Sequence, residues 1–353
     1  MKTKILIVVS LIVGTVLLYQ FYPKILLYWQ QTETTINEEE RAFFVKTGTS
    51  LEELENQLIA AGIIKDNSAF RNIADYKKLE DSNIGAGKYL IKKNYKVSHL
   101  INGFRLNALG NGNGEVEVQV TFNNCRDLQE VAGKVAKFIE TDSLTLVQLF
   151  ESAKTMQQFG FNTKTFPAMF IPNTYNMFWD TSAEQFIARM AEEFKRFWTP
   201  ERLEKAANMN LGQSKVVTLA SIVYAEQSLA KDEWPIIAGL YLNRLKQGMK
   251  LQSDPTFKFC WGRELDSNRR LYKKHREIDC PYNTYLYAGL PPGPINIPPA
   301  AVVDAVLNHD KNDYLFMCAQ ANNSGKHNFT KSYEVHQKNA SAFQKWMDER
   351  GIR

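Results

Sequence analysis

An apolar run near the N-terminus constrains this chain more than any other feature of its sequence. The run spans residues 5–22 and is interrupted only by Ser10, Gly14, Thr15 and Gln20. An apolar stretch of this length can cross a lipid bilayer as one helix. Lys2 and Lys4 precede it, and positive charge stays on the cytoplasmic side of a membrane. The sequence therefore predicts a single-pass anchor in the cytoplasmic (inner) membrane, with the rest of the chain outside the cytoplasm.

A cleaved signal peptide is the alternative interpretation of the same run. No small-residue cleavage box stands before Tyr19 to Pro23, and no Cys is placed to make a lipoprotein signal. The pattern favours an uncleaved anchor. We assign residues 1–29 to a cytoplasmic tip and transmembrane helix, and residues 30–42 to a polar tether.

The composition limits the classes of fold that the chain can adopt but does not identify its binding partner. With 353 residues, 44% of them hydrophobic and 12% aromatic, the chain can form an anchor and two or three packed lobes, which excludes general disorder. A net charge of +5 suits acidic wall polymers, anionic membranes and nucleic acid alike. Residues 263–276 include six Arg or Lys residues. This basic segment is interpreted either as a substrate-facing loop or as a solvated insertion. An extracytoplasmic location argues against nucleic acid.

Four cysteines would lie in an oxidising compartment if the anchor prediction holds. They are Cys125, Cys260, Cys280 and Cys318. A disulfide between Cys260 and Cys280 is one hypothesis. Zinc binding is the weaker alternative because no pair has the two- to four-residue spacing of a metal knuckle, although His275 lies between two of the cysteines. We predict no metal and no other cofactor.

Residues 43–109 have the pattern of a small lobe. A strand at 43–45, helices from Ser50 and over 68–79, a strand at 87–91 and a helix over 98–106 follow one another. Ser50 and Glu53 form a capping-box pattern at the first helix. This order resembles the LysM-like lobe of wall-binding proteins, and a plain spacer domain is the alternative.

The glycine-rich segment 110–114 is the best candidate boundary before a larger region over residues 115–353. Residues 115–122 alternate as a half-buried strand, and helical patterns follow. We therefore predict an α+β fold with an N-terminal transmembrane helix, a small lobe and a larger mixed lobe.

Glu226 is the strongest candidate for chemistry in the larger lobe. Residues 215–230 have the periodicity of a buried helix, and Glu226 continues the apolar stripe of Leu219, Ile222 and Val223. A carboxyl group on such a stripe loses solvation, which raises its pKa and lets it carry a proton at neutral pH. Such a group can protonate a glycosidic oxygen. A structural salt bridge inside the lobe is the alternative.

Polar and aromatic loops follow this helix. A second helix is marked by Asp232 as a cap, by Pro235 in its first turn and by Gly248 at its end. The turn over residues 251–256 and the loops over 281–285 and 289–295 come next. Tyrosine faces and amide groups suit a sugar-binding groove, although proline-rich loops also occur as scaffolding.

An ordered set of motifs resembles the YceG-like (MltG) family of endolytic transglycosylases. The motifs are LASIVYAEQS, LYLNRLKQGMKLQSDPT, CPYNTY, AGLPPGPI, YLFMCA and GKHNFTKSYEVH. The resemblance covers essentially the whole chain and is strongest from Leu219 to His336. It implies non-hydrolytic cleavage of the bond between MurNAc and GlcNAc in nascent peptidoglycan strands, which leaves a 1,6-anhydroMurNAc end. It also implies an association with penicillin-binding proteins or other elongation synthases, with the catalytic region outside the cytoplasm.

The resemblance also indicates site residues. The family's catalytic Glu falls on Glu226. By similarity and chemistry the groove candidates are Asn243, Gln252, Ser253, Asp254, Tyr282, Asn283 and Tyr285. The sequence departs from many relatives at Tyr224, where Glu is common, at Asn173, where Asp is found, and at Cys280, where Ser is common. The departure at Tyr224 leaves Glu226 as the one carboxylate of its stretch. The departures at Asn173 and Cys280 leave the local contacts of those two residues undetermined.

One carboxylate suits a transglycosylase. A glycoside hydrolase normally needs two, whereas here the sugar's own 6-hydroxyl can attack while Glu226 acts first as acid and then as base. Asp254 is the reserve second carboxylate, and we interpret it as a turn-forming or substrate-orienting group. Two alternatives remain open, a non-catalytic glycan-binding scaffold of the elongation machinery and a two-carboxylate hydrolase.

Overall fold

The structure is a computed structural model that describes residues 14–16, 19, 21, 22, 33–265 and 273–351. The described residues form two compact units. The first contains the chain up to Gln119 together with Phe138–Glu140 and Asn176–Thr181. The second contains Val120–Lys137, Thr141–Tyr175 and the chain from Ser182 onward.

The prediction of a transmembrane helix is not supported and is corrected here. Most of residues 5–22 lie outside the described residues, and those described as helical within the run are 14–16, 19, 21 and 22. Within the described part of the chain no helix has the length and apolar character that a bilayer crossing requires. The fold of the described residues is mixed α and β. The predicted single-pass contact with the membrane depended on this helix, and the described residues do not support it.

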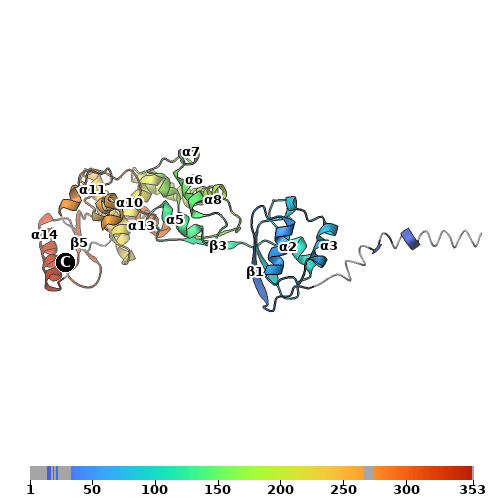
Figure 1. The fold of residues 1–353 in the computed structure, drawn as a ribbon. Coiled ribbons are helices and arrows are strands. Elements are labelled where there is room, and N and C mark those ends of the chain that lie inside the picture. Colours follow the sequence, from blue (N-terminus) through green and yellow to red (C-terminus); the bar gives the residue numbers. More distant parts are fainter. Residues whose placement is uncertain (1–13, 17–18, 20, 23–32, 266–272, 352–353) are drawn as a thin grey trace, which may run out of the picture. The chain divides into compact units, whose positions relative to one another are not determined.

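The first unit is built on a pair of antiparallel strands (Figure 1). Its elements are β1 (Glu40–Val45), α2 (Leu51–Ala60), α3 (Ser68–Lys77), the short helix η1 (Asp81–Asn83), β2 (Gly87–Lys92) and α4 (Val97–Phe104). The register of the pair runs from Glu40 opposite Lys92 to Val45 opposite Gly87. These elements lie close to the positions that the hydrophobic pattern predicts. The LysM-like assignment of residues 43–109 stays a prediction.

The core of the first unit lies between the strand pair and the three helices. Its centre includes Val45, Leu54, Phe70 and Phe104, all of which are buried. The capping box of α2 is formed, since the Ser50 side chain accepts from the Glu53 backbone and Glu53 accepts from the Ser50 backbone. Local capping and the apolar stripes together position this unit's helices.

The second unit is mainly helical. Strand β3 (Val118–Phe122) pairs with β4 (Asn173–Met177). The helices are α5 (Leu128–Val135), α6 (Ser143–Glu151), α7 (Ala153–Gln158), η2 (Phe166–Met169), α8 (Ala183–Phe197), α9 (Pro200–Asn208), α10 (Gln213–Glu226), η3 (Lys231–Glu233), α11 (Trp234–Lys246), α12 (Asp254–Trp261), η4 (Gly262–Leu265), η5 (Lys273–Glu277) and α13 (Ala300–Leu307). The last elements are β5 (Phe316–Ala319), β6 (His327–Thr330) and α14 (Tyr333–Glu349).

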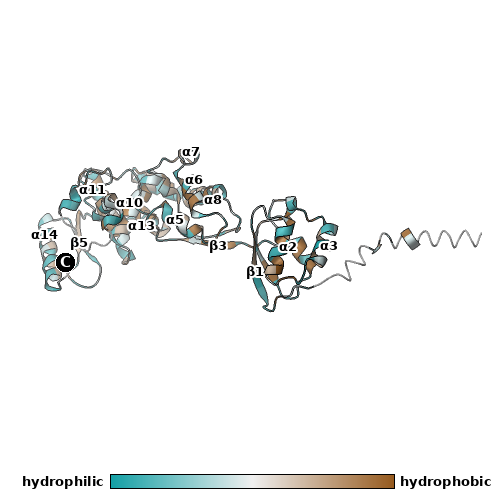
Figure 2. Ribbon diagram, in the orientation of Figure 1, coloured by the Kyte–Doolittle hydropathy of each residue, from teal (hydrophilic) through white to brown (hydrophobic). Residues whose placement is uncertain are grey.

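Helix α10 forms the centre of the second unit. Every residue from Val216 to Val223 is buried, and α11, α12 and α13 pack against the helix. By contrast, α14 contains no buried residue and is largely hydrophilic (Figure 2). A helix that is enclosed by three others gives the residue at its end a fixed position, which is where Glu226 lies.

Candidate active site

Glu226 is the last residue of α10, where the helix leaves the core. The predicted stripe of Leu219, Ile222 and Val223 is fully buried. Gln227 ends the helix with an extended backbone (φ −140°, ψ 100°). Glu226 as a whole residue is partly exposed, so it lies where the buried helix approaches the surface, while its carboxyl group loses most of its solvation.

Two hydroxyl groups hold the Glu226 carboxyl. Oε1 accepts a hydrogen bond from the Tyr241 hydroxyl of α11 at 2.8 Å and a second one from the Ser253 hydroxyl. Loss of solvation raises the pKa of Glu226, and the negative charge of Asp254 acts in the same direction. The two hydroxyl donors and the charge of His327 oppose that shift, and the net direction is upward. The carboxyl group therefore retains a proton at higher pH than an exposed Glu does.

Ser253 is fixed by a buried group of hydroxyls. Its backbone N–H donates to Oγ1 of Thr284 at 3.0 Å, and Oγ1 of Thr256 donates to its carbonyl at 2.6 Å. The two threonine hydroxyls are 2.8 Å apart. All three side chains are buried. The sequence predicts only a polar turn here, whereas the structure starts α12 at Asp254 and uses the turn to aim Ser253 at Glu226.

Gln252 precedes Ser253 in a left-handed backbone conformation with φ of 50°. This region is rarely occupied by a residue other than glycine, asparagine or aspartate. Gln252 is exposed, and its backbone N–H donates to the Thr284 carbonyl at 3.1 Å. The strained turn thus faces the Gln252 amide towards solvent while Ser253 points inward.

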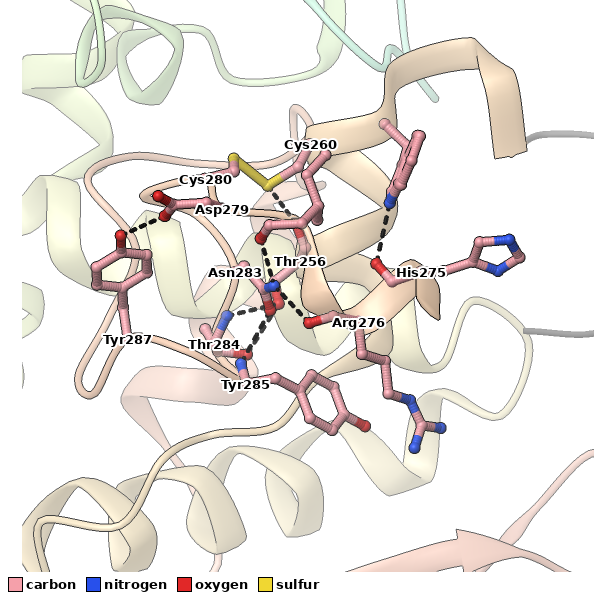
Figure 3. Close-up of a disulfide and its surroundings, with 12 residues drawn as sticks. Thr256, Cys260, His275, Arg276, Asp279, Cys280, Asn283, Thr284, Tyr285 and Tyr287 are labelled. Atoms are coloured by element: carbon pink, nitrogen blue, oxygen red, sulfur yellow. Dashed lines mark hydrogen bonds between the residues drawn. A yellow bond between two sulfur atoms is a disulfide. The ribbon is translucent and has the colours of Figure 1, made fainter. Parts of the chain in front are cut away.

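The 280–285 loop is braced by a disulfide between Cys260 and Cys280 (Figure 3). Asn283 is completely buried, and its Nδ2 donates to the carbonyls of Arg276 and Ile278 at 2.9 and 2.8 Å. The disulfide occupies two of the sulfur atoms that the zinc alternative would have required. Asn283 therefore holds the loop together from inside.

Tyr285 and Asp254 form a second polar contact. The Tyr285 hydroxyl donates to Oδ1 of Asp254 at 2.6 Å, and the Arg276 guanidinium lies 3.6 Å from the same oxygen and 4.9 Å from the Tyr285 ring centre. Burial and the negative charge of Asp254 raise the pKa of Tyr285. Tyr282 instead packs on Phe259, with 4.6 Å between ring centres.

A groove of about 420 Å³ lies beside the end of α10. Tyr224, Ala225 and Ser228 line it from the Glu226 segment, and Pro255, Lys258 and Phe259 line it from α12. Residues 124–126 and 295–296 complete the lining. Tyr224 also donates from its hydroxyl to Oδ1 of Asn124 at 2.7 Å. Glu226 itself is not among the lining residues, although its neighbour Ala225 is. A groove with aromatic and polar walls can hold a sugar chain.

Asn243 lies on α11 and contacts a different segment. Its Nδ2 donates to the carbonyls of Asn312 and Tyr314 at 2.9 and 3.1 Å. The structure therefore brings Ser253 and Glu226 into direct contact, brings Asp254 to Tyr285, and joins Asn243 to the chain that leads into β5.

Tyr241 and three further side chains near Glu226 were not predicted as site residues from the sequence. Glu233 is 3% exposed, and its two carboxylate oxygens lie 2.8 Å from the His327 backbone N and 2.7 Å from His327 Nδ1. Gln227 Nε2 donates to Glu233 at 2.9 Å, and the Gln227 carbonyl accepts from the Trp234 indole. This network fixes the chain immediately after Glu226. His327 stands in the GKHNFT motif, but no local pattern relates it to Glu233, 94 residues earlier.

Comparison with known proteins identifies the family. The model of the YceG-like family matches residues 43–342. This chain belongs to that family. A Bacillus subtilis protein named endolytic murein transglycosylase is 30% identical to this YceG-like chain over 88% of the chain and 85% of its own length. A Streptococcus pneumoniae protein of the same name is 24% identical over 84% of the chain and 57% of its own length.

A solved structure shows the same fold. The crystal structure of a YceG-like protein from Listeria monocytogenes superposes with a TM-score of 0.54 at 23% identity, over 85% of this chain and 98% of that one. The family model and the Bacillus subtilis relative confirm the YceG-like family assignment made from the ordered motifs.

Proposed function

We propose that this YceG-like chain is a lytic transglycosylase that cleaves peptidoglycan strands internally, with Glu226 as its acid and then its base. The observation that carries the proposal is the Glu226 carboxyl group, held by Tyr241 and Ser253 at the end of a buried helix, with its pKa raised by loss of solvation. The names of the curated relatives support the same substrate and reaction.

The reaction follows from one carboxyl group. Protonated Glu226 donates its proton to the glycosidic oxygen, and the bond from that oxygen to C1 of MurNAc breaks. The electron-poor C1 is then attacked by the 6-hydroxyl oxygen of the same sugar, while the Glu226 carboxylate removes the hydroxyl proton. Glu226 ends protonated as it began, no water is consumed, and the product carries a 1,6-anhydro ring.

Two other carboxylates of the region are engaged in contacts of their own. Asp254 accepts from Tyr285 and lies near Arg276, and Glu233 is paired with His327 and Gln227. A hydrolase of the usual kind needs a second carboxylate that is available as a base or nucleophile. These contacts favour the transglycosylase over the two-carboxylate hydrolase.

The Cys260–Cys280 disulfide supports a location outside the cytoplasm, since such bonds persist in oxidising compartments. We extend the proposal to action on nascent strands beside penicillin-binding proteins, which the resemblance implies. Crosslinking of the chain to a synthase in growing cells, compared with a strain that lacks that synthase, tests the association.

Mass spectrometry of glycan strands digested by the purified chain tests the proposed reaction. We expect new internal ends that carry 1,6-anhydroMurNAc. Reducing MurNAc ends would indicate a hydrolase, and strands that stay intact while they bind the chain would indicate a scaffold; either result refutes the proposal.

A further inference from the structure

A second cavity of about 490 Å³ lies in the second unit, at the start of α10. Gln213, the first residue of α10, helps to line it, and Glu226 is the last residue of the same helix. With a rise of 1.5 Å per residue, the two helix ends are about 20 Å apart. The cavity is therefore separate from the candidate active site.

The walls of this cavity are aromatic on several sides. Phe161 and Phe194 meet edge to face with 5.4 Å between ring centres, and the Trp198 ring centre is 6.1 Å from that of Phe194. Phe159 and Leu203 also line the cavity, and Leu203 is 42% exposed. Such walls favour small apolar groups such as methyl groups.

Trp198 lines the cavity and carries a buried donor without a partner among the described residues. Its side chain is only 4% exposed, and its indole N–H has no hydrogen-bond acceptor within the described part of the chain. A buried N–H without a partner destabilises the folded chain. A ligand that brought an acceptor to this N–H would remove that destabilisation.

Two further features favour an anion. Gly212 is the N-cap of α10 and supplies no side-chain cap, so the first N–H groups of the helix are uncapped where Gln213 and Ser214 line the cavity. The helix N-terminus carries partial positive charge. The exposed Lys195 adds a full positive charge, and the described residues that line the cavity include neither Asp nor Glu.

We propose that this cavity binds the carboxylate end of a short peptide whose last side chains are small and apolar. The indole N–H, the α10 N-terminus and Lys195 match the carboxylate, and the aromatic walls match the methyl groups. A volume of about 490 Å³ suits one or two such residues. The choice of a peptide rests on the proposed function, because peptidoglycan stem peptides carry carboxylates.

Nuclear magnetic resonance of the full-length chain with ¹⁵N-labelled tryptophan tests the site. The ligand is N-acetyl-alanyl-alanine, its matched control is the same peptide with a C-terminal amide, and Trp198→Phe identifies the Trp198 signal. We expect the acid to shift that signal saturably with a Kd on the order of millimolar, and the amide to bind about tenfold more weakly. Free acetate should bind more weakly than the peptide acid, since it lacks the apolar part.

Two lysine variants distinguish a specific binding site from nonspecific attraction of the anionic peptide to positive charge. Lys195→Gln should weaken binding of the acid about threefold to tenfold, with the shift of the Trp198 signal as the readout. The exposed Lys215, also in the first turn of α10, does not line the cavity, so Lys215→Gln should bind as the wild type does. Equal shifts from acid and amide, equal affinity for acetate, or equal effects of the two lysine changes would overturn the proposal.

The proposal for the active site and the proposal for the cavity can be refuted independently of each other. Glu226→Gln should bind the peptide acid with wild-type affinity, and a loss of binding in this variant would count against a separate site. If the wild-type chain bound the peptide but did not cleave glycan strands, the proposed function would fail and the carboxylate site would stand.

Discussion

The hydroxyl of Ser253 donates a hydrogen bond to Oε1 of Glu226, although the two residues are 27 positions apart in the chain. Tyr241, from a third segment, donates to the same oxygen. The proton affinity of Glu226 is therefore the result of a competition. Burial favours the protonated acid, and the two donors favour the carboxylate.

Replacing Glu226 with Gln should abolish most of the activity and leave the fold intact. Gln keeps the size of the side chain and cannot transfer a proton, so the rate of anhydroMurNAc formation should fall by about 10²- to 10⁴-fold. The rate is measured by product analysis and folding by circular dichroism. Glu151→Gln, an exposed change at the end of α6, is the matched control and should retain full activity.

The same substitution should stabilise the chain at higher pH. Because the folded state raises the pKa of Glu226 above its ordinary value of 4.5, the folded chain binds more protons than the unfolded chain above that pH, and the Glu226 contribution to stability falls as pH rises. Glu226→Gln removes this penalty. Its Tm relative to wild type should increase as pH rises above about 4.5; a difference that stays constant with pH would show that Glu226 does not titrate as proposed.

Ser253→Ala should shift the pH dependence of the reaction. The Ser253 hydroxyl lowers the pKa of Glu226, so its removal raises that pKa further and moves the alkaline limb of kcat/KM to higher pH. The rate at the optimum should fall about tenfold, consistent with one hydrogen bond to a charged group. Ser341→Ala on the exposed face of α14 should change neither quantity. A lower rate with an unmoved limb would assign Ser253 a purely structural role.

The disulfide should stabilise the second unit. Cys260 and Cys280 are 20 residues apart, and closing a loop of this length is worth about 3 kcal/mol in the chain-entropy model. The double change of both residues to Ser should lower the free energy of unfolding in urea by about that amount. Cys318 is a free cysteine, and Cys318→Ser should have a much smaller effect. Reductant should destabilise wild type and leave the double variant unchanged.

Glu115 in the first unit should also make the stability of the folded chain depend on pH. Burial, and then the negative charge of Asp180, raise the pKa of Glu115 to about 8. Its contribution to stability is complete below about pH 4.5 and is lost as pH rises through about 8. Glu115→Gln should therefore raise the Tm near pH 9 and have little effect near pH 5. The exposed Glu117 is the control, and an equal response of Glu117→Gln would contradict this assignment.

Local patterns in the sequence determine much of the fold. The capping box of Ser50 and Glu53 starts α2, and the stripe of Leu219, Ile222 and Val223 is buried in α10. Both depend on residues three or four positions apart, which one helical turn brings together whatever the rest of the chain does. The same logic placed Glu226 on a buried helix over residues 215–230, and the structure ends that helix at Glu226 itself. It also predicted a membrane helix over residues 5–22, which the described residues do not support.

Only the tertiary structure decided what surrounds Glu226. Tyr241 and Ser253 reach its carboxyl group from two other elements, Glu233 pairs with His327 across 94 residues, and Cys260 joins Cys280 in preference to the other cysteines. No periodic pattern in the sequence predicts these contacts, because they depend on how α10, α11, α12 and β6 pack. The sequence by itself determines where the carboxyl group stands on its helix, and packing determines its partners and its proton affinity, since desolvation and hydrogen bonding act only once distant segments have met.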